Sequence, residues 1–243
     1  MAHIRTAKDA KRLGTIMGIW AHPDDETFLS GGIMATAIAN GQTVVCVTAT
    51  KGEAGKYDHS RWPDGNLGSI RAAELNKALR KLGIKHHYYL DCQDGCCCDA
   101  PRPAVITRLC HLMDKYEPDT ILTFGPDGWS GHPDHCQVSS WVKEAVSTLE
   151  NKPKIYHTLH TPQQYEKYLK SIDDKLNFFF NIDQPPLALA SECAICFELP
   201  KDICEKKYQA LKLMESQTDK LFESFPEDFI HEAIGTEYFR LAK

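Results

Sequence analysis

The sequence lacks any apolar run that approaches the roughly 20 residues needed to span a bilayer. It also lacks an apolar signal-peptide core, because residues 1–14 include Lys8, Asp9, Lys11 and Arg12. Its basic residues form no long cluster, and 28 Lys and Arg are outnumbered by 33 Asp and Glu. We therefore expect a cytoplasmic protein whose partners are neither nucleic acid nor membrane.

Internal repeats, low-complexity tracts and linker-like segments are also missing. A chain of 243 residues fits one α/β domain, so residues 1–243 are predicted to form a single domain. The ten cysteines do not indicate a disulfide framework, since an intracellular chain of this length does not need one. Cys193 and Cys196 have the spacing of a metal-binding or redox pair, but one such pair alone is a weak signal.

Short, β-branched apolar segments alternate with helical patterns along most of the chain. Strands are predicted at 15–21, 43–50, 86–90, 120–124 and 154–158, and helices at 32–39, 69–82, 104–115, 133–149 and 201–216. This alternation predicts an α/β fold of Rossmann-like type, in which helices flank both faces of a mostly parallel sheet. Residues 237–241 are predicted to close the sheet as an edge strand.

Polar clusters follow three of the predicted strands, at residues 21–26, 51–55 and 131–135. Ligands bind beyond the carboxyl ends of the strands in such sheets. His22 with Asp25, and His132 with His135, are pairs of metal-binding residue types three positions apart. Two ligands from the first cluster and one from the third would make a catalytic zinc site with a position left for water, and Asp24 would be free to accept a proton. A capping turn explains one His-Pro-Asp tripeptide, but not two with these extra residues.

The motif AHPDDE at 21–26, together with HPDH at 132–135, resembles the PIG-L/LmbE-like family of zinc-dependent N-acetylglucosaminyl deacetylases. The resemblance extends through residues 52–55 to Ser216 and Gln217. It implies a hydrolase that removes an N-acetyl group from a glucosamine-containing small molecule and uses Zn²⁺. Fe²⁺ would bind to the same ligands. Members of this family often form homo-oligomers.

Carried over by position, the resemblance also implies roles for individual residues. The implied metal ligands are His22, Asp25 and His135. Asp24 would be the general base, His132 would stabilise or protonate the reacting centre, and Asp134 would orient the His132 imidazole.

Three further residues are candidates for substrate binding. Arg71 and Asp94 match family positions that hold the sugar, and Glu53 lies between two glycines near them. The alternatives are an Arg71–Glu74 pair on one helix, a turn formed by Asp94 and an exposed Glu53. Some relatives carry a tyrosine where this chain has Ser130, so the exact substrate stays open.

Two other classes of function remain. One is a different metal-dependent amidase or esterase, although the motifs contain no phosphate-binding glycine-rich loop. The other is a non-catalytic zinc-binding protein, whose site would be closed by a fourth protein ligand such as Cys136. The remaining histidines without a partner at ligand spacing are predicted to be structural: His59, His86, His87, His111, His157 and His160.

Overall fold

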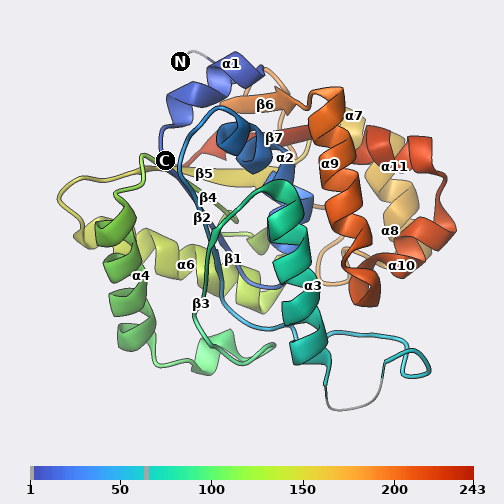
Figure 1. Ribbon diagram of the computed structural model, residues 1–243, viewed down its shortest axis with the longest axis horizontal. Helices are drawn as coiled ribbons and strands as arrows, with labels where there is room; N and C mark the ends of the chain where they lie inside the picture. Colours follow the sequence, from blue (N-terminus) through green and yellow to red (C-terminus); the bar gives the residue numbers. More distant parts are fainter. Residues whose placement is uncertain (1–2, 63–65) are drawn as a thin grey trace.

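The computed structural model describes residues 3–62 and 66–243. In these residues the strands form one seven-stranded sheet with the order β3-β2-β1-β4-β5-β7-β6 (Figure 1). The strands are β1 (Ile16–Trp20), β2 (Val44–Thr48), β3 (His86–Tyr89), β4 (Thr120–Thr123), β5 (Lys154–Leu159), β6 (Ile195–Glu198) and β7 (Thr236–Leu241). The pairs from β3 to β5 are parallel, whereas β7 is antiparallel to both β5 and β6. The predicted mostly parallel α/β sheet is confirmed.

Helices cover both faces of this sheet (Figure 1). α2 (Asp25–Ala39), α3 (Leu67–Leu82) and α9 (Lys201–Lys212) pack together, and α4 (Arg102–Tyr116) packs on α6 (Pro133–Thr148). Parallel crossovers are right-handed, and the chain moves one way along the sheet from β1 to β3 and the other way from β3 to β5. The α2–α3 layer and the α4–α6 layer therefore lie on opposite faces.

The remaining helical segments are shorter. They are α1 (Ala7–Ala10), α5 (Gly128–Gly131), α7 (Pro162–Gln164), α8 (Lys170–Leu176), α10 (Glu215–Ser224) and α11 (Glu227–Ile234), with 3₁₀ turns at Lys11–Leu13 and Cys97–Asp99 and a π-helical turn at Tyr165–Leu169. None of the helices in the described part of the chain is long and apolar enough to cross a bilayer.

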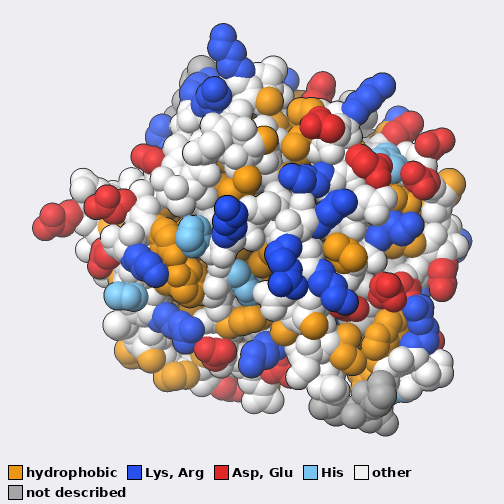
Figure 2. All heavy atoms as spheres, in the orientation of Figure 1, with side chains coloured by type: hydrophobic (Ala, Val, Ile, Leu, Met, Phe, Trp, Pro, Cys, Tyr) orange, Lys and Arg blue, Asp and Glu red, His pale blue; other side chains and the backbone are white. Residues whose placement is uncertain are grey.

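The pattern of buried residues explains why these segments form these elements. Every residue of β1 and β2 is buried, as expected for central strands covered on both faces. In α3, Leu75, Leu79 and Leu82 are buried on one side. The exposed sides of α3 and α9 carry lysine and arginine side chains, which gather over these helices in Figure 2.

Three details of the predicted secondary structure were wrong. Residues 237–241 do not form an edge strand, because β7 lies between β5 and β6. The predicted helix at 201–216 ends earlier, and α10 begins after a break at Leu213 and Met214. α2 begins at Asp25 rather than at residue 32, because the Gly31–Gly32 pair obscured a helix that continues through it.

The strand order also fixes where a ligand site can form. β1 and β4 are neighbours at the centre of the sheet, and the connections that follow these two strands run to opposite faces. The crevice beyond the carboxyl ends of such strands is the usual binding position in open α/β sheets. The first and third polar clusters of the sequence follow β1 and β4.

Candidate active site

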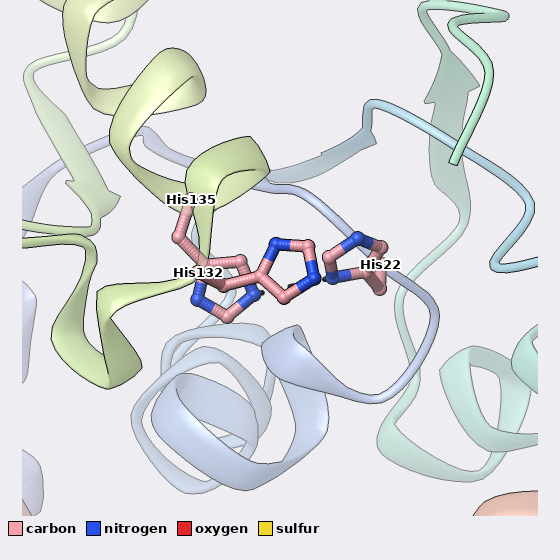
Figure 3. A group of neighbouring side chains, drawn as sticks. All are labelled: His22, His132 and His135. Carbon is pink, nitrogen blue, oxygen red and sulfur yellow. Dashed lines mark hydrogen bonds between the residues drawn. The ribbon is translucent and has the colours of Figure 1, made fainter. Parts of the chain in front are cut away.

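Two segments meet beyond the carboxyl ends of β1 and β4. The turn after β1 carries His22 and Asp24, and α2 begins at Asp25. His132 is the N-cap of α6, and His135 lies in its first turn. Figure 3 shows the three imidazole rings pointing toward one another from these segments. Their ring centroids are 4.8–5.1 Å apart.

Two carboxylates orient the His22 ring by contacting its Nε2 atom. Its Nε2 lies 2.9 Å from Asp94 Oδ1 and 3.2 Å from Asp134 Oδ2. Nε2 therefore carries a proton, and Nδ1 faces His135 Nε2 at 3.1 Å. Carboxylate partners of this kind fix the tautomer of metal-binding histidines. Nδ1 is thus the atom of His22 that can bind a metal.

His135 presents its other ring nitrogen to the same point. Its Nδ1 lies 3.0 Å from the carbonyl oxygen of Gly128 and 3.2 Å from Ser130 Oγ. Because a carbonyl only accepts hydrogen bonds, Nδ1 carries the proton and Nε2 keeps its lone pair. Burial lowers the pKa of His135 to about 4, so the ring is neutral at neutral pH. The Phe124 ring stacks on it with centroids 4.0 Å apart.

The carboxylate of Asp25 completes a set of three converging donors. Its oxygens lie 3.6 Å from His22 Nδ1 and 3.5 Å from His135 Nε2. Zinc bound tetrahedrally at about 2.0–2.2 Å from its ligands holds them roughly 3.3–3.5 Å apart. Two imidazole nitrogens 3.1 Å apart need a proton or a cation between them. The residues present therefore fit a divalent metal with mixed nitrogen and oxygen ligands.

The charges around His22 favour a cation at the same place. Burial alone would lower the pKa of His22, but hydrogen bonds with Asp134, Asp25 and Asp94 raise it well above its usual value. A metal ion would supply the positive charge that this protonated ring otherwise provides. With a metal bound, His22 would lose its Nδ1 proton and keep the Nε2 proton that faces Asp94 and Asp134.

Asp24 lies beside the converging donors and is held by Arg71. The Arg71 guanidinium donates to Asp24 Oδ2 at 3.1 Å and to the carbonyl oxygens of Pro23 and Gly52 at 2.7 and 2.9 Å. A side chain at Gly52 would collide with this guanidinium, which explains the glycine. Asp24 has φ 121°, a strained conformation for a residue with a Cβ. Burial raises its pKa to about 7, and Arg71 opposes this rise.

The substrate-binding candidates contact other residues of the site. Arg71 and Asp94 are both buried, and Asp94 Oδ2 accepts the amide proton of Ala54 at 2.8 Å while Oδ1 faces His22. Glu53 is exposed, and its Oε1 accepts from the backbone amide of Asp94 at 3.1 Å. Glu74 accepts from Ser216, so the alternative Arg71–Glu74 pair is not formed. The polar atoms of Arg71 and Asp94 are directed at the base and a metal-ligand candidate.

Asp134 also differs from its expected role. Its carboxylate accepts from the amides of Gly95 and Cys97 at 2.8 and 3.1 Å and faces His22. The Asp134 contact with His132 comes from its backbone amide, which donates to His132 Nδ1 at 3.1 Å. The side chain expected to orient His132 thus orients His22 instead.

This contact assigns the tautomer of His132. Because Nδ1 accepts a hydrogen bond, the neutral ring carries its proton on Nε2. Burial lowers the pKa of His132, in agreement with a neutral ring. His22, His132 and His135 form a group whose ligand atoms lie within 4.8 Å. Because His132 Nδ1 accepts the hydrogen bond of the helix cap and Nε2 carries the proton, neither nitrogen is free to bind a metal. Asp25 is therefore the better third ligand.

The sequence interpretation missed the residues that orient His135. The Gly128 carbonyl and Ser130 orient His135, and Trp129 between them has φ 61°, unusual for a bulky residue. In the sequence, only Gly128 and Gly131, on either side of Trp129 and Ser130, indicate an unusual backbone conformation here. Cys136 lies against Gly128 and belongs to none of the candidate metal groups in the described residues. All ten cysteines are free, and Cys193 and Cys196 pack with Leu159.

The fold and the convergence of His22, Asp25 and His135 define an α/β protein with a candidate metal centre at the crevice between β1 and β4. Residues 17–146, more than half of the chain, match the family described as PIG-L, GlcNAc-PI de-N-acetylase. The chain therefore belongs to the PIG-L family. The matched range includes every metal-ligand and catalytic candidate, and it ends before β5.

A similar protein is a 1D-myo-inositol 2-acetamido-2-deoxy-alpha-D-glucopyranoside deacetylase from Mycobacteroides abscessus. It is 32% identical over 179 residues, which cover 65% of this chain and 64% of that protein. The chain spans between 54% and 64% of the lengths of the first such relatives.

Two solved structures resemble the chain more completely but at low identity. N,N'-diacetylchitobiose deacetylase from Pyrococcus horikoshii is 23% identical with a TM-score of 0.59, covering 96% of this chain and 85% of that one. The 4-carboxy-2-hydroxymuconate hydratase from Pseudomonas putida is 16% identical with a TM-score of 0.63, covering 95% and 96%. These likenesses show the fold, which also carries a hydratase, so the reaction has to be argued from the site.

Proposed function

We propose that this protein is a metal-dependent hydrolase that removes the N-acetyl group from a glucosamine-containing small molecule. The observation that carries the proposal is the convergence of His22 Nδ1, His135 Nε2 and the Asp25 carboxylate beside Asp24. Membership of the PIG-L family supports it. Zn²⁺ suits this ligand set, and Fe²⁺ is the alternative.

When bound, the metal would supply Lewis-acid activation of water and of the amide carbonyl. Asp24 would accept the proton of the attacking water, since its carboxylate is fixed by Arg71 at the edge of the donor set. His132 would donate from Nε2 toward the oxygen on which negative charge develops. The proton held by Asp24 can then pass to the amine that leaves, which an amide requires because its nitrogen is a poor leaving group.

The substrate proposal has separate support. The relatives named above as deacetylases act, by their names, on acetamido sugars. We propose that Glu53, which is exposed beside the site, contacts the sugar, and that Arg71 and Asp94 contribute through the residues they hold.

The test is an assay of free amine released from a panel of N-acetylated sugars, simple acetamides and acetate esters. The metal-stripped protein should be inactive, and one equivalent of Zn²⁺ or Fe²⁺ per chain should restore turnover of an N-acetylglucosaminide. Full activity without metal, or turnover of the esters alone, would refute the proposal. Hydration of an unsaturated acid without amide hydrolysis would favour the hydratase-like chemistry.

Two variants of adjacent carboxylates separate the base from the ligand. Asp24→Asn should keep one metal per chain and lose about 10²–10⁴-fold in kcat, the usual contribution of a general base. Asp25→Ala should lose metal, measured by elemental analysis after dialysis. Equal metal loss in both variants would contradict these two roles.

A further inference from the structure

A cavity of about 490 Å³ opens at Asp24 and Asp25. One wall is a face of α2 on which Asp25, Phe28 and Leu29 lie together, because residues three and four apart share a helix face. The cavity is therefore continuous with the candidate active site.

The other walls of this cavity are mainly apolar. They come from the segment after β5 and from the C-terminal helices, with Leu169, Ile172, Phe178, Leu221, Ile230 and Ile234 among the lining residues. Charged lining residues are mostly exposed, as are Lys56, Asp58, Arg61, Lys175, Glu215, Lys220 and Glu223. Besides Asp25, the buried charged residues that line it are Lys207 and Glu237, but Lys207 Nζ lies 2.7 Å from Glu237 Oε1 and 3.3 Å from the Ile234 carbonyl oxygen. These charges bind each other, so the walls favour an apolar occupant.

The sugar candidate Glu53 does not line the cavity, and neither do Arg71, Asp94 or His22. Arg71 contacts Asp24, Asp94 contacts His22, and Glu53 contacts Asp94. None of these contacts involves the apolar residues of the cavity wall. An amide whose carbonyl carbon lies at Asp24 has its amine on one side and its acyl group on the other. With the glucosamine near Glu53, the acyl group is directed toward the cavity.

The extent of the family match bears on this wall. The matched range, residues 17–146, holds the catalytic candidates, whereas the apolar residues named above from 169 to 234 lie beyond it. The family match therefore says little about this side of the site. An acetyl methyl group is also far smaller than a 490 Å³ cavity.

We propose that the enzyme accepts N-acyl glucosaminides whose acyl chain is longer than acetyl, with the chain lying in this cavity. The inference rests on the proposed function. Water adds its oxygen to the acyl carbon, the carbon–nitrogen bond breaks and the nitrogen gains a proton. The products are a medium-chain carboxylate and the free amine. Each buried methylene increases kcat/KM about fourfold, equivalent to about 0.8 kcal/mol.

The experiment compares methyl glucosaminides that carry N-acetyl, N-butanoyl, N-hexanoyl and N-octanoyl groups, with the metal-loaded enzyme. We expect kcat/KM to rise with chain length, by at least about 100-fold from acetyl to octanoyl. Ala233→Leu adds bulk at a residue that lines the cavity, and should reduce the ratio of octanoyl to acetyl kcat/KM at least tenfold. Ala73→Leu, the same change at an exposed position of α3, should leave the ratio unchanged.

Binding gives a second measurement, which does not depend on turnover or on the folding of Ala233→Leu. Calorimetry with the metal-loaded Asp24→Asn variant should show tighter binding of the octanoyl than of the acetyl glucosaminide. Hydrolysis of the acetyl compound with a rate that falls as the chain lengthens would overturn the acyl proposal and leave the proposed function standing. Tighter octanoyl binding without hydrolysis of any compound would support the cavity and overturn the deacylase function.

Discussion

At the scale of single residues, the sequence predicted which side chains lie together better than it predicted their individual contacts. Residue type and spacing indicated the pairs His22 with Asp25 and His132 with His135, and the family resemblance implied His22, Asp25 and His135 as the ligands. The ligand atoms of these three residues converge. The contacts of Arg71 and Asp94 could not be predicted, because they depend on side chains and carbonyls that come together only when β1 and the loops after β2 and β3 are assembled. A family position identifies which residue is present, but not which atom it touches.

Replacing Arg71 tests whether it positions the base or binds the sugar. Arg71→Ala removes the hydrogen bond to Asp24 Oδ2 and those to two buried carbonyls. A hydrogen bond to a charged group is worth about 1.5–3 kcal/mol, so we expect a roughly 10- to 100-fold loss. The loss should appear in kcat rather than KM, and should be equal for an N-acetylglucosaminide and a simple acetamide.

The matched control for this change is Arg80→Ala, on the exposed side of the same helix, which should keep wild-type kinetics. A rise in KM confined to the sugar substrate would instead support direct sugar binding by Arg71.

At the scale of elements, most periodic segments were predicted, whereas β6, α8 and α11 in the C-terminal third were not. The buried strands and amphipathic helices before residue 160 carry the pattern in their own residues. β6 is short and includes Cys196, so it was considered only as part of a cysteine pair. The position of β7 depends on pairing with β5 and β6, and local periodicity contains no information about that order.

A contact between β7 and α2 illustrates such a long-range dependence. The Glu237 carboxylate accepts from the amides of Gly32 and Ile33 at 2.7 and 2.8 Å, in the middle of the helix that begins with Asp25. Lys207 of α9 neutralises this carboxylate, and both side chains are at most 2% exposed. The three elements are thus joined through one buried charge pair.

Removing one partner of this pair should be costly. Lys207→Met leaves the Glu237 carboxylate buried without its cation, and we expect a loss of about 3–5 kcal/mol in the free energy of unfolding. The double variant Lys207→Met/Glu237→Gln should recover part of this loss, since the glutamine oxygen still accepts from α2 without a charge. Urea denaturation measures both, with Lys201→Met at an exposed position of α9 as control. A loss under 1 kcal/mol in the single variant would contradict the argument.

At the scale of the whole molecule, the alternation of strands and helices predicted the sheet architecture. The crevice beyond the carboxyl ends of the strands in such a sheet predicted where the candidate site lies. The cavity could not be predicted, because its lining comes from segments that are distant in sequence. Burial of titratable groups is another property of the assembled molecule. His87, His157 and His160 were predicted to be structural, and each has its pKa lowered to about 4, mainly by burial.

These histidines predict a fall in stability as the solution is acidified. The unfolded His87 binds a proton below its usual pKa of 6.5, whereas the folded one does so only below about 4. Between these values unfolding takes up a proton, so the stabilising effect is complete above pH 6.5 and decreases toward pH 4. His87→Gln should therefore reduce the loss of unfolding free energy between pH 7.5 and pH 5 by up to about 2 kcal/mol. Urea denaturation at both pH values measures the difference, and the exposed His111→Gln should keep the wild-type loss. An unchanged loss in His87→Gln would show that His87 is solvated and able to protonate in the folded protein.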